Sequence, residues 1–154
     1  MIEMQLQGLT LDPITNMPVI VLKGKNCDDI LSIWIGNFEA NALSMKIENV
    51  FIPRPMTHDL IANLIKNLEA HVSRIIINDL KDNTYYAVIH IEKDGNIYEI
   101  DSRPSDAINI ALRVDAPIFV EEKVLQKYKN GFNGKINEND IKEWLESLKP
   151  EDFI

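Results

Sequence analysis

The chain has 154 residues, of which 45% are hydrophobic and 26% charged, a composition typical of one water-soluble domain. This length and composition exclude a disordered, collagen-like or multidomain protein. The formal net charge of −8 disfavours binding of nucleic acid through a broad basic surface, so any phosphate site must be local.

The N-terminal stretch MIEMQLQG has neither the basic region nor the apolar region of an export signal. The apolar runs along the chain are only a few residues long, too short to span a membrane. Cys27 is the only cysteine, so no internal disulfide can form, which is typical of a reducing compartment. We therefore expect a cytoplasmic protein with no membrane segment.

The first third of the chain predicts an antiparallel meander followed by a helix. Alternating apolar residues favour three strands, at about 2–11, 18–23 and 30–35. Gly36 ends the third strand, and helical spacing follows over about 37–49. Most of this helix should be buried, so Glu39, opposite its polar stripe, needs a partner for its charge.

The middle of the chain predicts a helix, a second meander and a further helix. A helix over about 57–70 begins with Thr57 as its N-cap. Tight turns then separate three strands, at about 72–80, 84–92 and 97–101. Ser105 is placed to cap the next helix, at about 105–114.

The C-terminal part predicts a short strand at 117–120 and two helices, at about 121–129 and 138–148. Together these elements indicate one α/β domain of the α+β type. Its mixed, largely antiparallel sheet is built from two meanders and flanked by about four to five helices.

Two segments of similar composition carry the first functional signal. RPMTHD (54–59) and DSRPSD (101–106) each combine an arginine, a proline, a hydroxyl residue and an acid where a helix begins. Backbone N–H groups and the helix dipole favour an anion there, and Arg54 or Arg103 could hold it with two parallel hydrogen bonds. The alternative is that both segments are only well-capped helix starts, with each arginine paired to its own aspartate.

Acidic residues and a histidine near these segments are candidates for catalysis. His58 borders the apolar face of its helix and could still reach water, which suits proton transfer, although such a histidine is often a bystander. Burial or a partner would shift the proton affinity of Glu39, but its place in a first helical turn also has a structural explanation. Asp101 could oppose Asp106 across a divalent cation, or could instead satisfy turn amides.

Five stretches resemble the bifunctional nuclease domain family in order and spacing: LSIWIGNFEANAL (31–43), RPMTHDL (54–60), VSRIIINDLKDNTYYAVI (72–89), IDSRPSDAINIAL (100–112) and APIFV (116–120). The resemblance covers about residues 2–125. It implies a compact mixed α/β domain that self-associates and has nuclease activity on both RNA and DNA. On this basis we place the domain at 1–125 and a helical C-terminal extension at 126–154.

The leading hypothesis is a phosphodiester hydrolase that acts on RNA or DNA, and it requires both helix starts to meet at one cavity. Phosphate would be held by Arg54, Arg103 and Ser105. The metal, Mg²⁺ or Mn²⁺, would be held by Asp101 and Asp106. The catalytic groups would be His58, Asp59 and Glu39.

The alternative hypothesis is a non-catalytic module that binds an anion, a small ligand or a protein, and whose paired motifs build an oligomer interface. The net charge of −8 favours this alternative, because an acidic surface repels a polyanion. In both hypotheses we expect a homo-oligomer.

Overall fold

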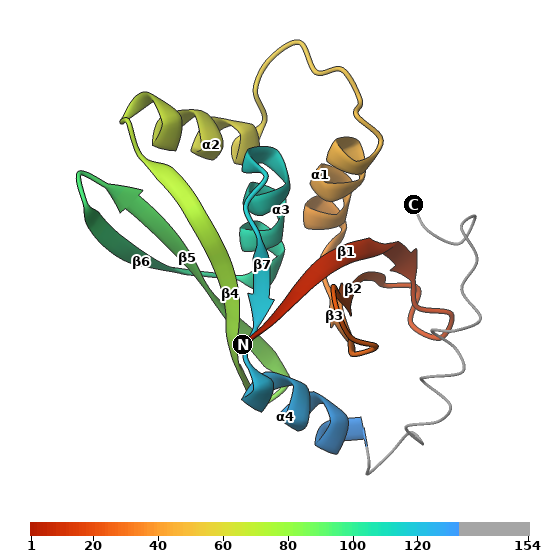
Figure 1. The fold of residues 1–154 in the computed structure, drawn as a ribbon. Coiled ribbons are helices and arrows are strands. Elements are labelled where there is room, and N and C mark those ends of the chain that lie inside the picture. Colours follow the sequence, from red (N-terminus) through yellow and green to blue (C-terminus); the bar gives the residue numbers. More distant parts are fainter. Residues whose placement is uncertain (133–154) are drawn as a thin grey trace.

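Two antiparallel meanders form most of the sheet in a computed structural model, which describes residues 1–132 (Figure 1). The first meander consists of β1 (Ile2–Leu11), β2 (Pro18–Gly24) and β3 (Ile30–Trp34). The second consists of β4 (His71–Lys81), β5 (Thr84–Lys93) and β6 (Asn96–Ser102). Both predicted meanders are therefore confirmed.

A short strand joins the two meanders into one seven-stranded sheet within residues 1–132. β7 (Ile118–Val120) lies between β1 and β4, antiparallel to β1 and parallel to β4. The strand order is β3-β2-β1-β7-β4-β5-β6, a mixed and largely antiparallel sheet, as predicted. The sheet is strongly curled: although β3 and β5 are far apart in the strand order, the Tyr85 hydroxyl on β5 donates a hydrogen bond of 3.2 Å to the Ser32 carbonyl on β3.

Four helices flank the sheet in the described part of the chain: α1 (Asn37–Ile47), α2 (Thr57–Asn67), α3 (Pro104–Val114) and α4 (Glu122–Phe132). α3 packs against β4 and β5, and both α1 and α2 pack against α3 (Figure 1). α4 instead packs at the far end of β4, and its Tyr128 belongs to the core. The predicted domain boundary at 125 falls inside α4, and the predicted helix 138–148 lies outside the described residues.

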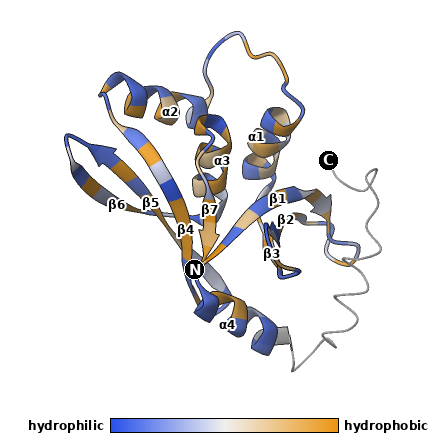
Figure 2. Cartoon of the chain, in the orientation of Figure 1, coloured by the Kyte–Doolittle hydropathy of each residue, from blue (hydrophilic) through white to orange (hydrophobic). Residues whose placement is uncertain are grey.

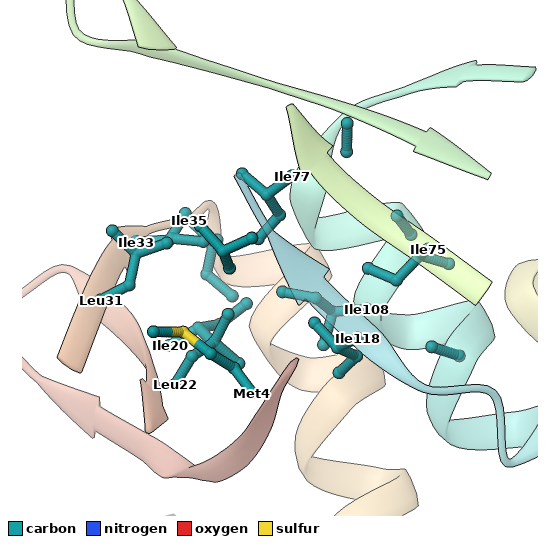
Figure 3. Close-up of a cluster of buried hydrophobic side chains, with 14 of the residues drawn as sticks. Met4, Ile20, Leu22, Leu31, Ile33, Ile35, Ile75, Ile77, Ile108 and Ile118 are labelled. Atoms are coloured by element: carbon teal, nitrogen blue, oxygen red, sulfur yellow. The ribbon is translucent and has the colours of Figure 1, made fainter. Parts of the chain in front are cut away.

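The core lies between the curled sheet and α3. Figure 3 shows side chains of the first meander, such as Ile20 and Leu22, gathered with Ile75, Ile118 and Ile108 of α3. Figure 2 shows β7 as hydrophobic along its length, since strands border it on both sides. This packing fixes α3 on the sheet and so fixes the position of its N-terminus.

The two predicted N-caps are wrong, because Thr57 and Ser105 both lie inside their helices. At the start of α2, Oδ2 of Asp59 accepts a hydrogen bond of 3.0 Å from the backbone N–H of Met56. The carboxylate, at the third helical position, thus satisfies the backbone N–H of the N-cap residue, as in a capping box. At the start of α3, Pro104 has no N–H, which removes one of the donors that a cap would satisfy.

α1 is less buried than predicted. Its buried residues are Ala40, Ala42 and Leu43, whereas Phe38 is 90% exposed. The helix packs on α3 and β2 along one side only, so its other side is left uncovered within the described residues. Glu39 nevertheless has the partner that its charge requires.

Candidate active site

The beginnings of α1, α2 and α3 meet around one cavity of about 900 Å³, together with the start of β5 and the end of β6. Its lining includes Glu39 from α1, His58 from α2, and Arg103 and Asp106 from the start of α3. The segments RPMTHD and DSRPSD therefore lie side by side, as the leading hypothesis requires.

Asp106 links the two segments. Its Oδ1 lies 2.9 Å from Nε2 of His58, and its Oδ2 accepts a hydrogen bond of 2.9 Å from Nε of Arg103. Nη1 of Arg103 also lies 3.0 Å from Oε1 of Glu39. His58 is buried, whereas the Arg103 side chain is 65% exposed. The guanidinium is thus the accessible cation of this group of four side chains.

Asp106 and Arg103 hold each other in their charged forms. Burial by itself would raise the pKa of the Asp106 carboxyl, but the hydrogen bonds and charges of Arg103 and His58 outweigh burial and lower the pKa. The hydrogen bond and charge of Asp106 raise the pKa of Arg103, and Glu39 adds to this effect. At neutral pH the pair is ionised, and the charged carboxylate orients the His58 ring.

Asp59 is engaged on both of its oxygens and is not among the residues that line the cavity. Oδ1 accepts a hydrogen bond of 2.8 Å from Nε of Arg113, and Oδ2 accepts from Met56. Arg113 also donates to Oδ1 of Asn109 and to the carbonyl of Ala42, so it joins all three helices. Burial would raise the pKa of Asp59, but the Met56 N–H and Arg113 lower it overall. Both oxygens of Asp59 are thus engaged within the protein, and the catalytic role of Asp59 stays a prediction.

The three residues predicted to hold phosphate occupy different environments. Arg103 lines the cavity, whereas Ser105 is buried and, like the exposed Arg54, is absent from the lining. Arg103 does pair with Asp106 of its own segment, as the alternative interpretation expected. Arg54 makes no ion pair with any side chain in residues 1–132, and Asp59 of its own segment pairs with Arg113 instead.

The carboxylates do not form a ready metal site. Within residues 1–132 no group of three or more His, Cys, Asp or Glu side chains could hold a metal ion. Asp101 is exposed and lines the cavity, but both oxygens of Asp106 already contact His58 and Arg103. A divalent cation would have to compete with Arg103 for that carboxylate. The requirement for Mg²⁺ or Mn²⁺ stays a prediction.

Two exposed aromatic residues at the cavity were not predicted. Phe38 on α1 and Tyr86 on β5 both line the cavity and both are exposed. In the sequence each lies in an element whose apolar residues are expected to enter the core, so neither carried a separate signal. Together they give the cavity an apolar rim beside the guanidinium of Arg103.

The family model of the bifunctional nuclease domain matches residues 20–132. An uncharacterized protein of Mycobacterium tuberculosis (strain ATCC 25618 / H37Rv) is 38% identical over 162 residues, covering 98% of this chain and 97% of that protein. Bifunctional nuclease 1 of Oryza sativa subsp. indica is 32% identical over 116 residues, covering 73% of this chain and 34% of that protein. Bifunctional nuclease 1 of Arabidopsis thaliana is 30% identical over 139 residues, covering 85% and 42%. The match thus spans less than half of either plant protein.

Proposed function

The chain belongs to the bifunctional nuclease domain family, and from this premise we propose that it hydrolyses phosphodiester bonds of RNA or DNA in the cavity between α1, α2 and α3. One observation carries the proposal: an accessible guanidinium, Arg103, and a buried histidine, His58, share the carboxylate of Asp106 at one cavity. A phosphodiester substrate requires both a cation for its oxygens and a group that moves protons.

Arg103 binds the phosphate in this proposal. Its contacts with Asp106 and Glu39 engage two of about five N–H donors that a guanidinium offers, which leaves donors for a non-bridging oxygen. The planar group can form two parallel bonds with phosphate. Because Glu39 also contacts Arg103, an incoming phosphate competes with that carboxylate.

His58 transfers the proton of the attacking water. When Nε2–H donates to Asp106, Nδ1 is the ring nitrogen that accepts a proton, and the carboxylate stabilises the imidazolium that forms. Glu39 is the second candidate for proton transfer, since its carboxylate also lines the cavity.

Cleavage of fluorescent single-stranded RNA and DNA by the purified full chain tests the proposal. We expect Arg103→Ala to lower kcat/KM about 100-fold, as expected when a donor to a developing charge is lost. The matched control is Arg74→Ala, because Arg74 lies over the ring of Phe119 and does not line the cavity. Equal activity in the two variants would indicate a contaminating nuclease and overturn the proposal.

The predicted metal requirement needs its own measurement. Activity in excess EDTA is compared with activity in Mg²⁺ and in Mn²⁺. We expect EDTA to abolish cleavage and either cation to restore it. Full activity in EDTA would contradict the requirement.

A second candidate role, as an oligomeric binding module, is favoured by the surface of α2. Leu60, Leu64 and Leu68 lie four residues apart along this helix and its C-terminal end, and all three are exposed. An exposed apolar stripe of this kind marks a surface that a partner covers. We infer that a second copy of the chain covers it and that the protein is a homo-oligomer.

None of the helices in residues 1–132 is long and apolar enough to span a membrane. We propose a cytoplasmic location, where the exposed Cys27 remains a thiol. Immunoblots of fractionated cells test this proposal, and recovery of the protein outside the cytoplasmic fraction would contradict it.

A further inference from the structure

Three lysines surround the carboxylate of Asp79, near the end of β4, where α4 packs against this strand. Oδ1 of Asp79 accepts a hydrogen bond of 2.9 Å from Nζ of Lys127, and its Oδ2 lies 3.4 Å from Nζ of Lys81 and 3.9 Å from Nζ of Lys123. The Asp79 side chain is only 15% exposed, whereas those of Lys81, Lys123 and Lys127 are 63%, 53% and 47% exposed. The positive charges of this lysine cluster (Lys81, Lys123 and Lys127) therefore face solvent, with the negative charge beneath them.

Asp79 keeps the lysine cluster together. The hydrogen bond from Lys127, followed by that from the Leu80 N–H, holds the pKa of Asp79 far below its usual range. The carboxylate is therefore charged at any pH at which the protein works. Glu121 adds one further carboxylate, 3.7 Å from Lys123. In a chain with a net charge of −8, such an outward-facing group of cations has the local positive charge that phosphate binding requires.

Tyr86 connects the lysine cluster to the cavity. It pairs with Asp79 across β4 and β5, and Nζ of Lys81 lies 5.6 Å from the centre of its ring. The same tyrosine is exposed and lines the cavity. An exposed ring followed by lysines is the combination that binds single strands, because an unpaired base stacks on the ring and the phosphates follow the cations.

We propose that a single-stranded polynucleotide leaves the cavity over Tyr86 and continues across the lysine cluster, which binds its phosphates. This inference rests on the proposed nuclease function and adds a binding surface for the strand outside the cavity. The protein therefore binds a long single strand more tightly than a dinucleotide. It also prefers a single strand to a duplex, because paired bases cannot stack on Tyr86.

The test compares the full-length double variant Lys123→Ala/Lys127→Ala with the wild type. Fluorescence anisotropy measures binding of a phosphorothioate-linked oligothymidylate of about 20 nucleotides, and a separate assay measures cleavage of a dinucleotide. We expect Kd for the long strand to rise about tenfold. The slope of log K against log salt concentration should become shallower by about 1.4, as the loss of two phosphate contacts predicts. Dinucleotide cleavage stays unchanged, since neither lysine lines the cavity.

The matched control is Lys66→Ala/Lys93→Ala, which has the same net charge as the Lys123→Ala/Lys127→Ala variant. Lys66 lies in α2, and Lys93 ends β5, whereas Tyr86 lies near the start of that strand. We expect this control to bind the long strand like the wild type. Tyr86→Leu provides a second route, because it removes the stacking ring without changing charge and should also weaken binding about tenfold. Thermal melts confirm that each variant is folded.

The outcomes separate this inference from the proposed function. If the lysine variant and the wild type bind the long strand equally, the inference is overturned, while dinucleotide cleavage by the wild type still supports the nuclease. If the wild type cleaves neither substrate, the proposed function fails, and the anisotropy measurements still decide whether the surface binds a strand. Tighter binding of a duplex than of a single strand would also overturn the inference.

Discussion

Asp106 contacts a cation from its own segment and a histidine from another helix, so the geometry of the cavity depends on its charge. Its pKa in the folded protein lies below the ordinary value of 3.8. A carboxyl of this kind stabilises the fold above its unfolded pKa, and the contribution is lost as the pH falls through the folded pKa. We expect Asp106→Asn to lower Tm at neutral pH and the difference from wild type to shrink below pH 3.8. Thermal melts across this range measure it, and a constant difference would contradict the role of the charge.

His58 is expected to affect turnover more than binding, because Arg103 remains to hold the phosphate. Replacing His58 with alanine should lower kcat about 100-fold with little change in KM. The matched control is His71→Ala, since His71 is exposed on β4 and pairs with Glu92. Steady-state kinetics on a single-stranded oligonucleotide decide the point. Equal losses in the two variants would mean that His58 has no special role.

At the scale of single residues, the sequence predicts which side chains lie at a helix start, but it does not predict ion pairs between residues that are far apart in the chain. His58, Arg103 and Asp106 all reach the cavity, because a motif that opens a helix positions its side chains locally. The partner of Asp59 is Arg113, 54 residues further along the chain, and spacing carries no information about such a pair. Arg54 precedes α2 in a loop, and no periodicity there indicates which way its side chain points.

The start of α1 controls how closely Glu39 approaches Arg103. A Cβ on Gly36 would lie 2.5 Å from Oε2 of Glu39, so Gly36→Ala should move this carboxylate. In the proposed function Glu39 competes with phosphate for Arg103, so we expect binding of inorganic phosphate to tighten, by up to about fivefold, the equivalent of one surface ion pair. Gly131→Ala is the control, since its Cβ would meet nothing within 4 Å. Titration calorimetry measures both, and unchanged affinity in Gly36→Ala would contradict the competition.

Among the elements, both meanders and the helices of residues 1–132 could be predicted, because alternation and tight turns are local signals. The insertion of β7 between β1 and β4 could not, since it pairs strands from opposite ends of the domain. The sequence also overestimated the burial of α1, because this burial too depends on contacts between elements that are far apart in the chain. Its apolar residues are compatible with a core, but only its packing on α3 and β2 decides which of them are covered.

In the part of the chain that the structure describes, residues 1–132, an apolar stripe on α2 is exposed, from which we infer a homo-oligomer. Leu64→Lys places a charge at the centre of the stripe formed by Leu60, Leu64 and Leu68, so we expect it to dissociate the oligomer. Asn63→Lys is the control, because Asn63 is also exposed on α2 but lies outside the stripe. Light scattering gives the mass of each variant. A wild type that is monomeric at all concentrations would contradict the inference.

The proposed function requires one phosphodiester to bind at the point where the starts of α2 and α3 meet, and a crystal structure with a phosphorothioate-linked dinucleotide tests this most directly. We expect the bridging phosphate to lie within hydrogen-bond distance of Arg103, beside His58 and inside the cavity. A dinucleotide bound elsewhere, with Arg103 still closed between Glu39 and Asp106, would contradict it.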